Sequence, residues 1–263
     1  MIIVKIGGGN GINLAGIIKD LAEIKEKYVI VHGANALRDR LAEELGQPKQ
    51  VLTSTKGYTS VYSDDKLLDV MMMAYAGLRN KRIVEMCHQH GINAIGLTGL
   101  DGKLIQGKRN KGIRVYQGGK LKIVRDFSGK PEAVSKPLLE LLLGNGYVPV
   151  LTVPIIDEEN AAINTENDDV VRVLQQSLQA NTVINLIEAP GFLENRDDES
   201  SLIKTISSSE LKDREQQVEG RMKRKMLAVR KLFEQGATRV IISEGRSEHP
   251  VADALAGKGT VIA

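Results

Sequence analysis

The sequence predicts an α/β fold, a three-layer αβα sandwich around a mostly parallel central sheet. Short apolar runs rich in β-branched residues alternate with amphipathic segments along the whole chain. This alternation is typical of parallel strands that are covered by helices on both faces. Glycines close most of the apolar runs, where tight turns are needed. With 263 residues, the chain can form one large domain or two lobes that share a sheet.

Seven apolar runs are expected to form strands, and six amphipathic segments are expected to form helices. The strands are predicted at residues 2–6, 28–32, 93–97, 147–151, 182–187, 239–243 and 260–262. The helices are predicted at residues 14–26, 35–45, 64–90, 135–143, 168–179 and 221–235. Ser135 is a candidate N-cap, because a proline in the first turn and a glycine stop follow it. The polar, acidic stretch 189–210 is expected to be a loop.

Residues 100–130 depart from this alternation. Apolar residues recur at every second position around Gly118 and Gly119, which predicts a β-hairpin. The stretch 106–125 carries seven cations and no acidic residue, although the formal net charge of the chain is only +3. These cations are Lys108, Arg109, Lys111, Arg114, Lys120, Lys122 and Arg125. Such a basic ribbon would steer an acidic protein partner; a solvated hairpin and a nucleic-acid surface are the alternatives.

The amino-acid composition argues against several classes of protein. The chain has no Trp and 3% aromatic residues, which disfavours a base-stacking surface for single-stranded nucleic acid. No apolar run approaches the roughly 18–20 residues of a membrane span, and the N-terminal run lacks the features of a signal peptide, so the cytoplasm is expected. Cys87 is the single cysteine, which excludes an internal disulfide and a cysteine-rich metal site.

Glycine-rich turns follow the first two predicted strands. In KIGGGNG, Gly7, Gly8 and Gly9 would let backbone N–H groups approach a phosphate. Lys5 could reach the same anion, and a purely structural turn is the alternative. The second turn, VHGAN, would face the same crevice at the carboxyl edge of the sheet, with His32 either a hydrogen-bonded strand end or a direct ligand. No acidic residue ends the second strand, which argues against a dinucleotide site.

Two further segments carry charges near predicted helix starts. EGRMKRK (219–225) ends with Lys225 and places four cations in the first turns of a helix, where they oppose the helix dipole. A bound phosphate would offset this effect, and a solvated charged helix is the alternative. INTENDDVV (163–171) places Asn164, Glu166, Asp168 and Asp169 before a helix. These residues could cap the helix, or a carboxylate among them could position lysines.

The order of these motifs resembles that of the amino acid kinase family. It runs Lys-(apolar)-Gly-Gly, His-Gly, Asn-x-x-x-Asp and Gly-x-Met-x-x-Lys, and it spans nearly the whole chain. The order is that of acylglutamate kinases. GLTGLDGKL, the INTxxD run, EGRMKRK and the terminal GKGTVI are similar to the aminoadipate kinases of lysine biosynthesis. Those enzymes act on a substrate whose amino group is attached to a small acidic carrier protein.

The resemblance implies a role for each candidate residue. Lys5 and Lys225 would stabilise the transferring phosphoryl group, and Asp168 would orient both lysines. The backbone amides that would bind phosphate are those of Gly7, Gly8, Gly9 and Gly33. The substrate would contact Gly33, Ala34, Asn35, Tyr58, Thr59, Ser60, Val61 and Asn164. The nucleoside would contact Glu188, Gly191, Phe192, Leu193 and Met222.

The chain departs from the family pattern at two places. The second turn has Ala34 where a second glycine is usual, so the turn must differ locally if this position needs a positive φ. Acetylglutamate kinases place a substrate-clamping arginine at the position of Thr59, and carrier-dependent aminoadipate kinases place one at that of Val61. The α-carboxylate would instead be held by Tyr58, Ser60, Tyr62, backbone amides or a remote cation, or the substrate differs.

The resemblance implies a kinase that uses ATP and Mg²⁺ to convert a side-chain carboxylate into an acylphosphate. Phosphates and water would hold the Mg²⁺. The expected substrate is 2-aminoadipate, or glutamate, on a carrier protein that docks on Lys108, Arg109, Lys111, Arg114, Lys120 and Lys122. The alternatives are a kinase for free N-acetylglutamate and a non-catalytic binding or regulatory protein. Residues 1–178 would form the acceptor lobe and 179–263 the nucleotide lobe of a homodimer, with no nucleic-acid or membrane partner.

Overall fold

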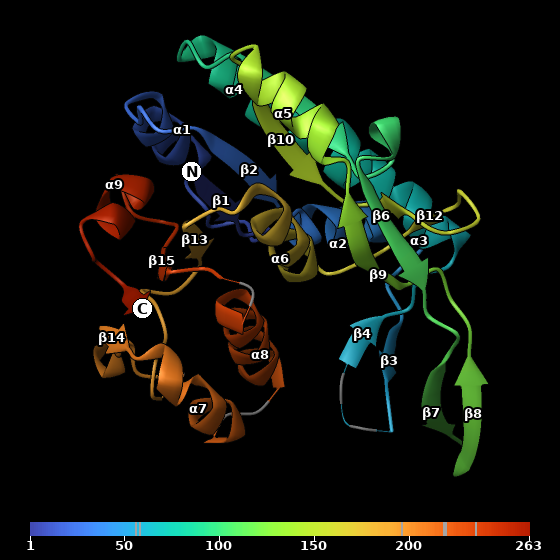
Figure 1. The fold of residues 1–263 in the computed structure, drawn as a ribbon. Helices are drawn as coiled ribbons and strands as arrows, with labels where there is room; N and C mark the ends of the chain where they lie inside the picture. Colours follow the sequence, from blue (N-terminus) through green and yellow to red (C-terminus); the bar gives the residue numbers. More distant parts are fainter. Residues whose placement is uncertain (56, 58, 196, 218–219, 235) are drawn as a thin grey trace.

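A computed structural model of the chain shows a three-layer αβα sandwich, which confirms the predicted fold class (Figure 1). The structure describes residues 1–55, 57, 59–195, 197–217, 220–234 and 236–263. Neighbouring strands of its eight-stranded sheet are parallel, except β15 and β16, which are antiparallel. In spatial order the strands are β14 (Thr205–Ile206), β16 (Thr260–Ile262), β15 (Arg239–Glu244), β13 (Thr182–Ile187), β1 (Ile2–Ile6), β2 (Tyr28–His32), β10 (Val148–Thr152) and β5 (Ala94–Thr98).

Helices cover both faces of this sheet. One face is covered by α1 (Leu14–Ala22), α4 (Asn80–Gln89) and α9 (Pro250–Leu255). The other is covered by α5 (Lys136–Gly144), α6 (Asn167–Leu178) and α8 (Gly220–Glu234). The remaining α-helices are α2 (Asn35–Glu44), α3 (Asp65–Met71) and α7 (Leu211–Gln217). Among the described helices, none combines the length and the apolar character that crossing a membrane requires.

The strands are apolar on both faces because each face lies in its own core. In β2, Val29 and Val31 enter one core, whereas Tyr28 and Ile30 enter the core on the opposite face. Every residue of β2 is buried. A strand covered on both sides reads as a continuous apolar run, which explains why the sequence pattern identified these strands.

The predicted helix 64–90 contains a π-helical segment, Met72–Arg79, between α3 and α4. A π-helix has more residues per turn than an α-helix, so it rotates the buried stripe around the helix axis. Met71 and Tyr75 accordingly lie in one core, whereas Ile83 and Cys87 lie in the other. The segment lets one continuous helix serve both faces of the sheet, which a plain 3.6-residue period does not predict.

Several predicted boundaries shift by a few residues. The strands predicted at 93–97 and 147–151 begin one residue later, and the first helix ends at Ala22. Ser135 stands at the N-cap position of α5, but its side chain makes no capping hydrogen bond, and its carbonyl accepts from the N–H of Leu139 at 3.2 Å. The stretch expected to be a loop, 189–210, includes β14 and two short 3₁₀ turns, Glu199–Ser201 and Ser208–Glu210.

A second sheet and two hairpins lie beyond the main sheet. The second sheet contains β12 (Ala162–Ile163), β11 (Ile155–Ile156), β6 (Ile105–Arg109) and β9 (Gly129–Val134). The hairpins are β3 (Val51–Thr53) with β4 (Thr59–Val61), and β7 (Ile113–Gln117) with β8 (Lys120–Val124). The β7–β8 hairpin was predicted, and its turn residues Gly118 and Gly119 have φ of 59° and 73°. Both hairpins project from the same end of the molecule (Figure 1).

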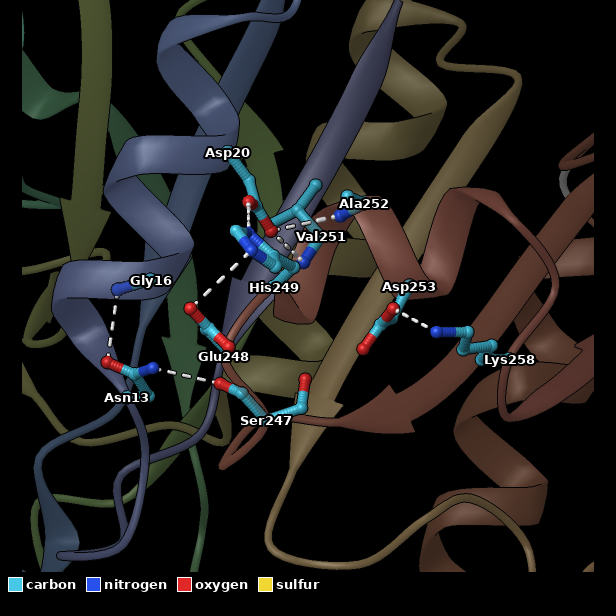
Figure 2. A network of polar contacts seen from close by, with 10 residues as sticks. All are labelled: Asn13, Gly16, Asp20, Ser247, Glu248, His249, Val251, Ala252, Asp253 and Lys258. Carbon is cyan, nitrogen blue, oxygen red and sulfur yellow. Dashed lines mark hydrogen bonds and ion pairs between the residues drawn. The ribbon is translucent and has the colours of Figure 1, made fainter.

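Asp20 connects α1 to the start of α9 (Figure 2). Its side chain is 6% exposed, and one oxygen accepts the N–H groups of Val251 and Ala252 at 2.9 and 3.0 Å. The other oxygen lies 3.0 Å from His249 Nδ1. The carboxylate thus satisfies backbone amides in the first turn of α9 from a distant part of the chain.

We expect Asp20→Ala to lower the free energy of unfolding by about 2 kcal/mol, because it leaves two amides in the first turn of α9, the one at Val251 buried, without an acceptor. Urea unfolding would measure the difference. Glu248→Ala is the control, since this side chain is 88% exposed and lies 3.9 Å from the other ring nitrogen of His249. The control should change stability by less than about 0.5 kcal/mol. Equal losses of unfolding free energy in the two variants would contradict the proposed contribution of the Asp20 contacts to stability.

Candidate functional site

The two glycine turns meet at the carboxyl edge of β1 and β2. A Cβ atom added to Gly8 would lie 2.8 Å from the backbone nitrogen of Ala34 and 2.7 Å from that of Asn35. A Cβ atom added to Gly33 would lie 3.0 Å from the backbone nitrogen of Gly8. A side chain at either position would force the turns apart. The two turns that the sequence predicted to face one another are therefore in contact.

The amides of these glycines have different uses. Gly7 N–H donates to Leu186 O and Gly33 N–H donates to Ile6 O, both at 2.9 Å, so the sheet already uses these two donors. For Gly8 and Gly9, no hydrogen bond from the N–H group is found among the described residues. Gly8 and Gly9 can therefore donate to an anion, whereas Gly7 and Gly33 shape the turns without donating outward.

Ala34 fits the second turn without strain. It has φ of −149° and ψ of 31°, outside the left-handed region that favours glycine. Its side chain is 1% exposed and packs in the core. The replacement of a second glycine by alanine therefore needs no unusual backbone conformation at this position.

Lys5 and Asp168 form an ion pair beside these turns. Lys5 extends from β1, and Asp168 lies in the first turn of α6. Their side chains are 14% and 29% exposed, so the pair is largely shielded from solvent but open on one side. The sequence allowed two roles for Asp168, capping the helix or positioning a lysine. The contact favours the second, because the carboxylate of Asp168 meets Lys5.

A cavity of about 20 Å³ borders this ion pair. Asn185 lines it because β1 and β13 pair in parallel with Lys5 opposite Asn185. The Oδ1 atom of Asn185 is buried, and no hydrogen-bond partner for it is found among the described residues. Apolar side chains of α8, including Ala228 and Val229, close the cavity. Its volume is sufficient for about one water molecule.

Lys225 belongs to α8 but lies outside the described side chains. Its backbone precedes Ala228 and Val229 by three and four residues, and those two residues line the cavity at Lys5. Positions three and four apart share one face of a helix. The side chain of Met222 and the whole of Tyr58 also lie outside the described part of the chain.

Asn164 is held by a buried polar cluster near the base of the hairpins. Its Nδ2 donates to the hydroxyl of Ser63 at 2.9 Å, and its N–H donates to Phe127 O at 2.7 Å. Ser63 has no exposed surface, and its N–H donates to Asp126 at 3.2 Å. Asp126 is 3% exposed and also accepts the hydroxyl of Ser128 at 2.6 Å. These bonds fix the position of Asn164 from two separate segments, at Ser63 and at residues 126–128.

Arg109 supports the same cluster from the basic ribbon. Its guanidinium carbon lies 3.9 Å from the centroid of the Phe127 ring. Its Nε donates to Asp126 O at 2.8 Å, and its backbone N–H donates to Glu158 at 3.0 Å. Arg109 therefore differs from Lys108, Lys111, Arg114, Lys120 and Lys122, which are exposed.

The segment expected to contact the nucleoside divides into two parts. Glu188 Oε1 accepts the N–H of Gly11 at 2.6 Å, so its carboxylate lies against the first glycine turn. Phe192 and Leu193 are 3% and 9% exposed, and their side chains are part of the interior. A Cβ atom on Gly191 would lie 2.7 Å from Thr260 Oγ1. Phe192 and Leu193 could therefore reach a nucleotide only through their backbone, which limits the role expected for them.

The segment after β3 offers short side chains in place of the absent arginine. Thr59 is exposed, whereas Ser60 and Val61 are half-buried. Val61 packs against the core on the face of the sheet that α5, α6 and α8 cover. Asn35 lies closer to the glycine turns, with its Oδ1 2.0 Å from the position of a Cβ atom on Gly8.

Ser63, Asn167 and Asn185 are site residues that the sequence analysis missed. Asn167 Nδ2 lies 3.5 Å from the Cβ position of Gly33. Its Oδ1 is buried, and no partner for it is found among the described residues. The run INTENDD contains Asn167, but sequence alone did not distinguish it from its neighbours. Ser63 and Asn185 become part of the site only through contacts between distant segments.

His32 is a structural residue and not a ligand. Its ring is fully buried, with Nε2 3.1 Å from Asn80 Nδ2 and Nδ1 3.4 Å from Gly33 O. Burial lowers its pKa to about 3, so the ring is neutral near pH 7. Asn80 also donates to Val150 O at 2.9 Å, which connects the start of α4 to β2 and β10.

No group of three or more His, Cys, Asp or Glu side chains suited to a metal ion is found in the part of the chain that the structure describes.

Comparisons with known proteins agree with this geometry. The model of the amino acid kinase family matches residues 1–243. The chain is 42% identical to a LysW-aminoadipate kinase of Thermus thermophilus, with 100% of both chains covered. It is 33% identical to a LysW-aminoadipate/LysW-glutamate kinase of Saccharolobus solfataricus, covering 100% of this chain and 99% of the relative. N-acetylglutamate synthase of Neisseria gonorrhoeae has a similar fold (TM-score 0.79, 19% identity), which covers 100% of this chain and 59% of the synthase.

We expect His32→Gln to weaken the acid sensitivity of folding. Unfolded histidine binds a proton near pH 6.5, whereas buried His32 resists protonation down to about pH 3. The unfolded state therefore binds more protons below pH 6.5, and stability falls as the pH decreases. Between pH 7.5 and 5.5, His32 should account for a loss of about 1.4 kcal/mol. Urea unfolding at the two pH values would measure it; an equal loss in both proteins would contradict this assignment.

Proposed function

We propose that this chain, which belongs to the amino acid kinase family, phosphorylates the side-chain carboxylate of aminoadipate or glutamate held on a carrier protein. The chain is a kinase. The LysW prefix in its relatives' names agrees with the carrier-linked substrate that the sequence resemblance implies. The observation that carries the proposal is the Lys5–Asp168 ion pair beside the two glycine turns.

The reaction needs positioning and charge neutralisation more than acid–base chemistry. A carboxylate is already an anionic nucleophile, so attack on the γ-phosphorus requires no general base. Its oxygen forms the new P–O bond as the bond to ADP breaks, and an acylphosphate results. Lys5 and the N–H groups of Gly8 and Gly9 would stabilise negative charge on the transferring oxygens. Asp168 would hold the ammonium of Lys5 toward the phosphoryl group.

ATP and Mg²⁺ are the proposed phosphoryl donor and its metal. The donors fit phosphate, because Gly8, Gly9 and Lys5 present two amides and one ammonium at one edge of the sheet. Mg²⁺, held mainly by phosphates and water, would neutralise charge on the leaving diphosphate. Lys225 is proposed as the second lysine at the transferring group, and Asn164 as a substrate contact.

The two lobes of the proposal correspond to the order of strands in the sheet. Strands from residues 1–178, β1, β2, β10 and β5, are contiguous on one side. Strands from residues 179–263, β13, β15, β16 and β14, are contiguous on the other. We assign acceptor binding to the first group and nucleotide binding to the second. A homodimer through the helix 65–89 is also proposed, since Met73 and Leu78 are 48% and 42% exposed there.

Two other functions are less well supported. A non-catalytic protein would not require a lysine and an aspartate paired beside two open amides. A kinase for free N-acetylglutamate would use the same reaction centre, but it gives no role to the exposed cations of the ribbon. A kinase for a carrier-linked substrate gives a role both to the reaction centre and to the exposed cations of the ribbon.

We expect Lys5→Ala to lower kcat by about 100- to 1000-fold, because one charge contact to the transferring group is lost. ADP formation would be measured with ATP, Mg²⁺ and aminoadipate attached to LysW of Thermus thermophilus. Lys19→Ala, at an exposed position of α1, is the control and should retain the wild-type rate. Full activity of Lys5→Ala would refute the proposed centre. Faster turnover of free N-acetylglutamate than of the carrier-linked substrate would refute the carrier assignment.

We expect neutralisation of Lys108 and Lys111 to raise KM for the carrier-linked substrate several-fold with little change in kcat. Both side chains are exposed, so their effect should act through steering and weaken with added salt. Initial rates at 50 and 500 mM NaCl would test this. Arg109 is left unchanged because it supports Phe127 and Asp126. A KM that is insensitive to both the substitutions and salt would contradict the steering role.

A further inference from the structure

One face of the β7–β8 hairpin is apolar and open to solvent. Directly opposite residues in an antiparallel pair lie on the same face. The pairs on this face are Arg114 with Ile123 and Tyr116 with Leu121, and we call these four residues the ribbon face. Tyr116 is 70% exposed, Ile123 63% and Leu121 57%. The ribbon face therefore combines three large exposed apolar side chains with one arginine.

The opposite face of the hairpin is different. Val115 points to it and is only 5% exposed. Val115 also forms an isolated bridge with Ser54, and Thr55 N–H donates to Arg114 O at 2.8 Å, so the hairpin is fixed beside β3. Lys120 and Lys122 belong to this second face. The hairpin is thus anchored through its backbone and presents its apolar side chains outward.

We propose that the ribbon face is the docking surface for the carrier protein, and that the carrier meets it with an apolar patch surrounded by acidic side chains. This inference rests on the proposed function and specifies where the partner binds. A cluster of large apolar side chains on a protruding strand pair is typical of an interaction site, whereas single exposed apolar residues such as Leu45 and Leu141 are ordinary.

The residue types fit the centre and rim of a protein interface. Aromatic residues and arginine are enriched among residues that contribute most to binding, and Tyr116 and Arg114 supply both. Lys108 and Lys111 add exposed positive charge on the same stretch of chain, whereas Lys120 and Lys122 are exposed on the opposite face of the hairpin. The apolar side chains would provide affinity, and the cations would favour an acidic rim and accelerate association.

The position of the hairpin connects this surface to the acceptor end of the site. At its base, Asn110 N–H donates to Ser128 O at 2.8 Å, and Ser128 forms an isolated bridge with Asn164. The five-residue strands extend from that base by about 16 Å. A small protein bound to the ribbon face would therefore lie on the same structural unit as Asn164, the proposed contact for its attached amino acid.

The test replaces Tyr116, Leu121 and Ile123 by threonine in one variant of the full chain, because threonine retains a high β-propensity. Initial rates are measured with aminoadipate attached to Thermus thermophilus LysW as the varied substrate. We expect KM for this substrate to rise at least tenfold, with kcat and KM for ATP within twofold of wild type. Leu141→Gln, an equally exposed apolar position on α5, is the control and should match wild type.

The outcomes separate this inference from the proposed function. No phosphorylation of LysW-aminoadipate by the wild type would overturn the proposed function itself. Phosphorylation by wild type with an unchanged KM in the triple variant would overturn only the docking surface. Loss of self-association in sedimentation, together with an unchanged KM, would assign the ribbon face to contacts between copies of this chain. A parallel rise in KM for ATP would indicate general distortion and would also overturn the proposal.

Discussion

The close approach of two backbone turns is the constraint on which the site depends. Gly8 and Gly33 come so near to one another that neither position has room for a side chain. Parallel pairing sets Ile6 opposite His32, so the turns that follow β1 and β2 begin at the same level. Lys5, one residue earlier, then faces the first turn of α6, where Asp168 meets it. Strand register thus brings Lys5 and Asp168 beside the N–H groups of Gly8 and Gly9, for which no acceptor is found in the described part of the chain.

A neutral polar bond in the interior maintains this arrangement. The His32 ring is fully buried, and its low pKa of about 3 keeps it uncharged. Asn80 reaches both His32 and the carbonyl of Val150, so one amide connects the long helix to two adjacent strands. The π-helical segment ends next to Asn80 and brings the helix from one core to the other. A charged ring at this place would have no compensating carboxylate among its hydrogen-bond partners, which are Asn80 and Gly33.

The sequence predicted seven of the eight strands of the main sheet and the meeting of its two glycine turns, because both follow from local patterns. It missed the two-residue β14, which lies in the stretch expected to be a loop. Buried parallel strands produce continuous apolar runs, and glycine marks close backbone contacts. The π-helical segment was missed because it changes the helix period without a composition signal. Ser63 and Asn185 were missed because only strand register and tertiary contacts bring them to the site. Counting charges also could not separate Arg109, which stacks on Phe127, from the exposed lysines around it.

Bonds at the base of the ribbon connect it to the segments that hold Asn164. Arg109 stacks on Phe127 and bonds to the carbonyl of Asp126, while the carboxylate of Asp126 fixes Ser63 and Ser128. Ser63 in turn accepts from Asn164. Under the proposed docking, a carrier on the ribbon would contact a hairpin whose base is bonded to Asn164, the proposed substrate contact.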